Sequence, residues 1–151
     1  MLKILSELRE AVSITRKRKI LKIILDSNVF FVPIYFKIDI FRELKQLLNR
    51  NFEMILISPV KQELETLSQK NFSFQDRKNI SFALKLALQC KYIEVKKPEK
   101  MPTDEIIIKK AKDWKAIVFT NDLELKKRLR DISVPVIYVR QKSFLAIDGM
   151  M

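Results

Sequence analysis

The chain of 151 residues contains no histidine, one cysteine and one glycine. The absence of histidine excludes Ser-His-Asp and Cys-His catalysis, HExxH metalloprotease sites and acid–base chemistry by imidazole. A single cysteine excludes a disulfide framework and a cysteine-based zinc module within these residues. The single glycine, Gly149, excludes a P-loop and a GxGxxG fingerprint. Catalysis is therefore left to carboxylates, lysines, hydroxyls and metal ions bound by oxygen.

Positive charge is in excess, with 30 Lys and Arg against 18 Asp and Glu and a formal net charge of +12. Lysine exceeds glutamate, so this balance favours a polyanionic partner such as nucleic acid over the Lys- and Glu-rich surface typical of thermophilic proteins. The longest near-apolar stretch, residues 29–36, is far shorter than the roughly 18–20 residues that cross a bilayer. Charged residues interrupt the apolar positions near the N-terminus, unlike in a signal peptide. We therefore expect a cytoplasmic protein without membrane contact.

Short apolar runs alternate with segments of helical periodicity from residue 20 onward. The expected strands are residues 20–25, 54–57, 92–95, 116–119 and 134–139, and the expected helices are residues 34–48, 58–67, 76–89, 103–113 and 121–130. Ser58 and Thr103 are expected to be the N-caps of the helices that they precede. The alternation predicts an α/β protein with a central parallel sheet of about five strands, covered by helices on both faces.

The first 19 residues are expected to form an N-terminal extension, separate from a domain that spans residues 20–151. Leu5, Leu8 and Val12 have helical spacing, and a basic run follows them. The extension is therefore predicted to be an amphipathic helix followed by a basic linker. Its apolar side either offers a surface for a homodimer or packs internally.

Acidic residues stand where a parallel sheet forms its ligand sites, which is at the carboxyl ends of the strands. Asp26 closes the first expected strand, and Asp122 lies just past the fourth. Glu63 falls at the edge of an apolar helical stripe, and Asp104 shares a helix face with apolar residues, so both can point inward. Three of the four acids have a simpler explanation when each is taken alone. These are an Asx-turn for Asp26, an N-cap for Asp122 and a favourable first-turn charge for Asp104.

The four acids together make a different case, because all of them can converge near the first and fourth strands. Converging carboxylates repel each other unless a cation neutralises them. An all-oxygen donor set in a chain without histidine favours Mg²⁺ or Mn²⁺, as one or two ions. The pattern therefore predicts a carboxylate metal site.

Four segments, taken in order, resemble the PIN domain family of nucleases. They are residues 24–28 (ILDSN), 60–64 (VKQEL), 103–106 (TDEI) and 120–125 (TNDLEL). The resemblance covers about residues 20–140 and implies a three-layer α/β/α sandwich. It also implies an Mg²⁺- or Mn²⁺-dependent endoribonuclease that cleaves single-stranded RNA by metal-activated water.

Residue roles follow from the same resemblance, position by position. The catalytic and metal-binding acids are Asp26, Glu63, Asp104 and Asp122, and the residues that support them are Asn28, Thr120, Asn121 and Glu124. Glu124 stands where many members of the family carry a further aspartate, and its side chain is one methylene longer. The residues expected to bind RNA are Arg16, Lys17, Arg18, Lys19, Lys97, Lys100, Lys126, Lys127, Arg128 and Arg130.

Residues 123–139 look most like the rRNA-processing PIN proteins of archaea and eukaryotes, so pre-rRNA is the first expected substrate. Two alternatives stay open. One is a VapC-type toxin ribonuclease that pairs with an antitoxin protein. The other is a non-catalytic module that uses the PIN fold to bind RNA or to assemble with other proteins.

Overall fold

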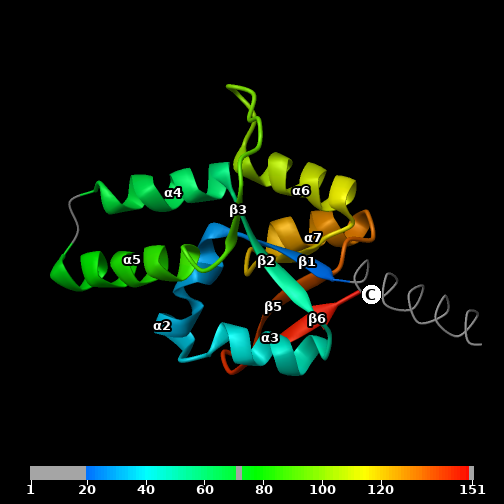
Figure 1. Ribbon diagram of the computed structural model, residues 1–151, viewed down its shortest axis with the longest axis horizontal. Helices are drawn as coiled ribbons and strands as arrows, with labels where there is room; N and C mark the ends of the chain where they lie inside the picture. The colour runs from blue at the N-terminus through cyan, green and yellow to red at the C-terminus, as the bar shows by residue number, and fades with distance from the viewer. Residues whose placement is uncertain (1–19, 71–72, 150–151) are drawn as a thin grey trace, which may run out of the picture.

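The computed structural model describes residues 20–70 and 73–149, so the extension expected at residues 1–19 lies outside the described residues (Figure 1). The elements in chain order are β1 (Leu21–Leu25), η1 (Ser27–Phe31), α2 (Val32–Phe36), α3 (Ile40–Leu48), β2 (Phe52–Ile57), α4 (Ser58–Ser68), α5 (Phe74–Ala87), β3 (Lys91–Ile93), α6 (Thr103–Trp114), β4 (Ile117–Phe119), α7 (Leu123–Asp131), β5 (Val136–Arg140) and β6 (Phe144–Asp148).

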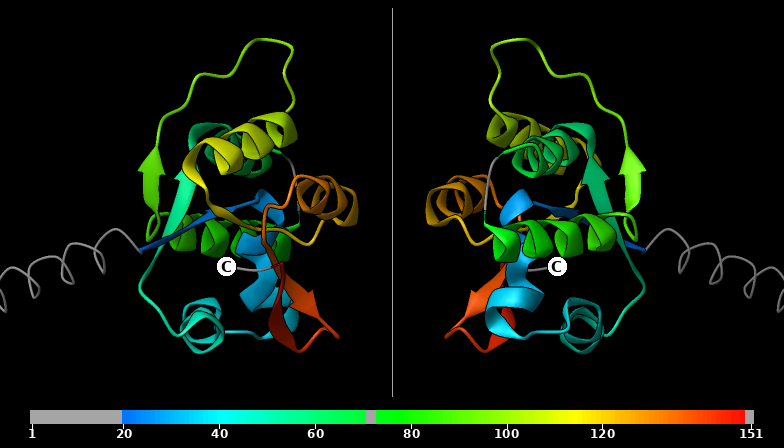
Figure 2. Two further views of the ribbon diagram at one scale, coloured as in Figure 1. Left: turned by 90° about the vertical axis from the view of Figure 1, so that its right-hand side faces the viewer. Right: turned by 90° about the vertical axis from the view of Figure 1, so that its left-hand side faces the viewer.

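The strands form one sheet in the order β3-β2-β1-β4-β5-β6. The first five strands are parallel, and β6 pairs antiparallel with β5. Helices cover both faces, with α3 on one side of the sheet and α6 on the other (Figure 2). The predicted α/β/α sandwich is therefore confirmed, and the strand order reverses between β1 and β4, where a ligand site is expected.

The central strands are buried on both faces, which explains why they are continuous apolar runs rather than alternating ones. Ile23, Ile24 and Leu25 of β1 have no exposed surface, and neither has Phe119 of β4. Leu25 stands opposite Phe119 in the parallel register of these two strands. The residues that follow each strand, Asp26 and Thr120, are therefore held side by side at the carboxyl edge of the sheet.

The helix predicted over residues 34–48 is wrong, because two helices occupy this segment. Helix α2 ends at Lys37, which adopts a left-handed conformation with φ 54°. Asp39 then caps α3, since its carboxylate accepts a hydrogen bond from the Arg42 N–H at 3.1 Å. Buried Ile38 lies between the two helices and anchors the break to the core.

The two N-cap predictions are also wrong. Ile57 and Pro102 occupy the cap positions of α4 and α6, and neither helix has a side-chain cap. The Ser58 hydroxyl instead donates to the Val95 carbonyl at 3.1 Å and accepts from the Val95 N–H at 2.9 Å. A tertiary contact has taken the hydroxyl that local capping would have used, and it ties the start of α4 to the chain leaving β3.

The antiparallel strand β6 was not predicted, because its hairpin lacks the usual sequence signal. Hairpin turns with positive φ favour glycine and asparagine. Here Gln141 and Lys142 take that role, with φ 52° and 57°. In the part of the chain that the structure describes, no helix is both long and apolar enough to cross a membrane.

Left-handed backbone at residues other than glycine recurs through the described fold and costs conformational energy. The residues concerned are Lys37, Asn49, Lys115, Ser133, Gln141 and Lys142. A chain with a single glycine must place other residues at its helix ends and turns, so these positions are where its stability can be raised.

We expect Lys115→Gly to stabilise the protein. Lys115 ends α6 at φ 52°, and its N–H bonds to the Ala111 carbonyl, which glycine would preserve. Glycine relieves the strain of the left-handed conformation but has more conformational freedom in the unfolded chain. The net effect is a stabilisation of about 1 kcal/mol, which corresponds to a rise in Tm of about 2–4 °C. Lys109→Gly is the control, since glycine inside a helix costs about 1 kcal/mol. Equal effects of the two variants in thermal unfolding would contradict this account.

Candidate active site

Asp26 is the most deeply buried acid of the candidate site, with 5% of its surface exposed. Its position directly after β1 holds the carboxylate at the edge of the sheet. Three donors satisfy it: the Ser27 N–H at 2.8 Å, the Asn28 side-chain amide at 3.1 Å and the Thr120 hydroxyl at 2.7 Å. Burial raises the pKa of Asp26, and the nearby charges of Glu63 and Asp122 raise it further. The hydrogen bonds from Thr120 and Ser27 act to lower it.

Asp122 caps α7, as its simpler interpretation predicts, and it also belongs to the site. One carboxylate oxygen, Oδ1, accepts from the Glu124 N–H at 2.9 Å and the Leu125 N–H at 3.1 Å. The Asp122 N–H donates to the Thr120 hydroxyl at 3.1 Å, and the same hydroxyl donates to Asp26. Thr120 therefore connects the two acids, and the two interpretations of Asp122 are compatible.

Asn28 and Asn121 tie the strand ends to each other. The Asn28 side chain donates to Asp26, and its Oδ1 accepts from the Asn121 N–H at 3.2 Å. The Asn121 Oδ1 in turn accepts from the Val139 N–H of β5 at 2.9 Å. The loop after β4 is thus held at both sides, and Asn121 acts on the backbone rather than on an acid directly.

Glu63 and Asp104 reach the site from α4 and α6, which approach the carboxyl edge separately. Both side chains are half-buried. Burial raises the pKa of Asp104, and the charges of Asp26, Asp122 and Glu63 raise it further, while Arg128 lowers it. The four acids are therefore near enough to act on one another, although they come from four separate segments of the chain.

The donor set has the chemistry that a hard divalent cation needs, since it consists of carboxylate oxygens with supporting hydroxyl and amide groups. The acids are not drawn together into a closed cage. Among residues 20–70 and 73–149, no three acidic or thiol side chains lie close enough to hold a metal ion between them. Like charges favour separation, so a cation would have to draw these acids closer than they stand here. The residues fit a divalent ion in chemistry and in location.

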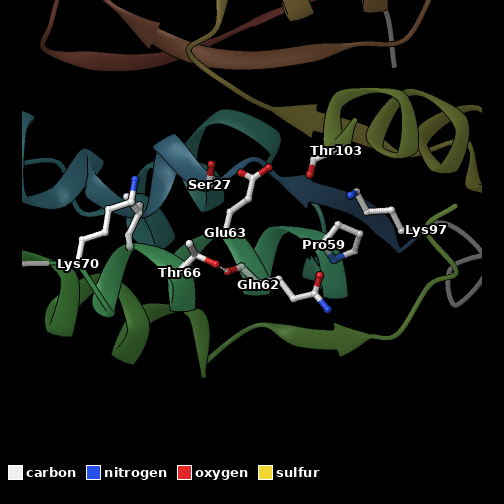
Figure 3. A pocket seen from close by; sticks show the side chains of 9 residues that line it. Ser27, Pro59, Gln62, Glu63, Thr66, Lys70, Lys97 and Thr103 are labelled. Atoms are coloured by element: carbon white, nitrogen blue, oxygen red, sulfur yellow. Dashed lines mark hydrogen bonds between the residues drawn. The ribbon is translucent and has the colours of Figure 1, made fainter. Parts of the chain in front are cut away.

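An open cavity of about 450 Å³ adjoins the acids, and Figure 3 shows the side chains that line it. Glu63 and Ser27 form the side toward the acids. Lys70, just past α4, and Lys97, in the connection between β3 and α6, lie on opposite sides of Glu63 in this view. Lys97 is among the residues expected from the sequence to bind RNA, whereas Lys70 is not, because a lone lysine after a helix has no distinguishing pattern.

Three of the four basic residues of α7 have partners within the fold. Arg128 pairs with Glu105 of α6, and Arg130 pairs with Asp148 and donates to the Val134 carbonyl. Lys126 also pairs with Asp148. Lys97, Lys100 and Lys127 are exposed, whereas residues 16–19 lie outside the described part of the chain. Of the residues expected to bind RNA that the structure describes, Lys97 is the one that lines this cavity.

Residues 23–142 match a family model described as a PIN like domain. The chain is 36% identical over 131 residues to ribonuclease VapC4 of Methanocaldococcus jannaschii, which covers 86% of this chain and 98% of that protein. It is 27% identical over 134 residues to ribonuclease VapC9 of Archaeoglobus fulgidus, which covers 88% of this chain and 93% of that protein.

Solved structures show the same fold. The PIN domain endonuclease Utp24 superposes with a TM-score of 0.70 at 23% identity, over 86% of this chain and 92% of that one. A domain of a functionally unknown protein from Methanocaldococcus jannaschii superposes with a TM-score of 0.57 at 15% identity, over 87% of this chain and 96% of that one.

Replacing Asp104 tests the mutual repulsion of the acids. With divalent cations removed, we expect Asp104→Asn to raise Tm by about 1–2 °C relative to Glu105→Gln, its control in the same helical turn. Both variants lose one negative charge near the helix N-terminus, but Glu105 has a favourable partner in Arg128.

The pH dependence of stability tests whether the neighbouring acids repel Asp104. The pKa of Asp104 in the folded protein is raised above 3.8, so the folded state takes up this proton more readily than the unfolded state. The wild-type protein therefore gains stability relative to Asp104→Asn as the pH falls through the folded pKa toward 3.8, and the difference between the two proteins disappears. Thermal unfolding from pH 7 to pH 4 measures this, and a difference that grows on acidification would refute the repulsion.

Proposed function

Because the chain belongs to the PIN-like domain family, we propose that it is an endoribonuclease that cleaves single-stranded RNA with the help of Mg²⁺ or Mn²⁺. The observation that carries this proposal is the position of Asp26 and Asp122 at the switch point of the sheet, where the Thr120 hydroxyl links them. Glu63 and Asp104 approach the same place and are near enough for the charges to act on Asp26 and Asp104. The names of the two VapC relatives, both ribonucleases, support RNA as the substrate.

Asp26 and Asp122 would hold the principal ion, with Glu63 and Asp104 completing its surroundings directly or through water. A divalent cation in this place supplies activation of a water molecule and stabilisation of the negative charge that develops on the phosphate. Thr120 fixes the separation of Asp26 and Asp122, since its hydroxyl bonds to both residues. Glu124 lies in the first turn of α7, two residues after Asp122, and is exposed, so its carboxylate is accessible to solvent.

The adjoining cavity supports a strand of RNA as the substrate. Lys70 and Lys97 present positive charge on two sides of it, and Gln62, Thr66 and Thr103 add polar groups. Phosphates of an extended strand would be attracted by the lysines and guided toward the acids, which on their own would repel them.

A VapC-type toxin ribonuclease with an antitoxin protein as partner is the cellular role that we propose first. The sequence relatives that match nearly the whole chain are named VapC, and the likeness to Utp24 concerns the fold. Processing of pre-rRNA, the role first expected from residues 123–139, is the second candidate. A non-catalytic binding module is less well supported, because binding alone gives no reason to gather four repelling acids beside a basic cavity.

Cleavage of single-stranded RNA in Mn²⁺ is the direct test of the activity. We expect EDTA to abolish cleavage, Asp26→Asn to lower kcat/KM by about 100-fold or more, and Glu63→Gln to lower it by about 10-fold or more, since each removes a ligand or its charge. Glu65→Gln is the matched control, because Glu65 lies on the same helix and pairs with Lys61 instead. Unchanged cleavage by Asp26→Asn would rule out the assignment.

Thermal unfolding separates metal binding from chemistry in the same variants. A cation that binds the folded state raises its Tm. Mn²⁺ should therefore stabilise the wild-type protein and Glu65→Gln, and should stabilise Asp26→Asn much less. A similar rise in all of them would place the ion elsewhere.

The salt dependence of RNA binding tests the basic cavity. Each phosphate contact contributes about −0.7 to the slope of log K against log salt for a single strand. Lys70→Gln and Lys97→Gln are each expected to make the slope shallower by about that amount, whereas Lys109→Gln, on the exposed side of α6, should leave it unchanged. Identical slopes in all four proteins would show that the strand avoids this cavity.

Cleavage sites mapped in total cellular RNA decide between the two roles. New ends that coincide with the ends of mature rRNA would favour processing. Ends inside mature RNAs, suppressed when an antitoxin is present, would favour the toxin.

A further inference from the structure

A second, smaller cavity lies on the other side of the site, against the loop that carries Asp122. Its volume is about 160 Å³, and Thr120 and Asn121 form part of its wall. The Thr120 hydroxyl bonds to Asp26 and accepts from the Asp122 N–H, so this cavity shares a wall with the acids themselves. A ligand that reacts at the acids would therefore reach the cavity with its adjoining group.

The walls of this cavity differ in character from those of the basic cavity. Phe36, Leu123 and Tyr138 supply apolar and aromatic surface, and Lys126 and Lys142 supply positive charge. Among residues 20–70 and 73–149, the side chains that line the basic cavity include two lysines and several polar groups but no aromatic ring. The two cavities therefore suit different parts of one nucleotide chain: phosphate on one side of the acids and an aromatic base on the other.

Leu123 is the unusual residue of this cavity. It follows Asp122 directly, and 79% of its surface is exposed although it is a large apolar side chain. It stands in the first turn of α7, where a polar residue would serve the helix equally well. Contact with an apolar part of a ligand would bury this side chain and would account for its position beside the acids.

The rest of the cavity is held in place before any ligand arrives. Lys126 places its Nζ 3.5 Å from the centre of the Tyr138 ring and also pairs with Asp148 at 3.7 Å. The Asn121 side chain accepts from the Val139 N–H at 2.9 Å, which fixes the loop against β5. Preformed walls reduce the ordering cost of binding, so even a small apolar contact can contribute to affinity.

We propose that this cavity is a nucleobase subsite, which receives the base of one nucleotide next to the scissile phosphate. The proposal rests on the proposed ribonuclease function and adds a position at which the enzyme requires a base. The strand would cross the acids with its phosphates toward Lys70 and Lys97 and with this one base against Leu123, Phe36 and Tyr138. Every base has a flat apolar face, so the contact is stacking and tolerates different bases.

The test is a set of RNA oligonucleotides that carry a single abasic residue at successive positions. Binding to the full chain is measured in EDTA by fluorescence anisotropy, and cleavage is measured in Mn²⁺. At one position next to the cleavage site, loss of the base should weaken binding by about 5- to 150-fold, the range of stacking on one side chain. In Leu123→Ala part of this penalty should disappear, because one of the three apolar walls of the cavity is already missing.

Leu88→Ala is the matched control. Leu88 is 80% exposed, like Leu123, but it lies between α5 and the start of β3, at the opposite edge of the sheet. This variant should keep the whole abasic penalty. Because Leu123 is exposed and alanine favours helix, Leu123→Ala is expected to unfold at the wild-type temperature, and that measurement excludes a general loss of structure.

The proposal is overturned if no abasic position weakens binding, or if the penalty is the same in Leu123→Ala and in the wild-type protein. The second result would mean that the base binds at another surface. A position-specific penalty in EDTA without any cleavage in Mn²⁺ would support the subsite and contradict the ribonuclease function. The two proposals therefore fail by different observations.

Discussion

The hydrogen bond between Thr120 and Asp26 is the contact on which the candidate site depends. It is buried, it measures 2.7 Å, and it joins residues 94 positions apart in the chain. A buried carboxylate is costly unless donors surround it, and three donors do so here. The pKa of Asp26 is still raised, because burial outweighs these bonds. The fold thus holds a charge that it only partly satisfies, which is what a site for a cation requires.

The positive charge of the chain is best understood around this acidic centre. A net charge of +12 would attract RNA to many surfaces. In the proposed function, the two cavities beside the acids bind different parts of the strand. The cavity with Lys70 and Lys97 is polar and basic, whereas the cavity with Leu123 and Tyr138 is apolar and aromatic. General attraction therefore comes from composition, while the path of a strand across the acids comes from the shape of the surface.

Much of the fold could be predicted because the strands are fully buried and their apolar runs are unmistakable. The parallel sheet and four acids placed near its switch point followed from that pattern. Two of the errors share one cause, which is tertiary contact overriding local preference. Ser58 bonds to Val95 instead of capping α4, and buried Ile38 anchors a break inside the segment predicted as one helix. The β6 hairpin escaped notice because Gln141 and Lys142 stand where glycine would have marked the turn.

The sequence by itself determined which chemistry is available. Without histidine, and with one cysteine and one glycine, carboxylates and a metal ion were the catalytic route that matched the residues present. Only the tertiary structure decided which neighbours those carboxylates have. Lys70 lines the cavity beside the acids because α4 ends there, and Arg130 pairs with Asp148 across the fold. Residue types are local properties of a sequence, but charge interactions act through space, so the partners of each group are set when distant segments pack together.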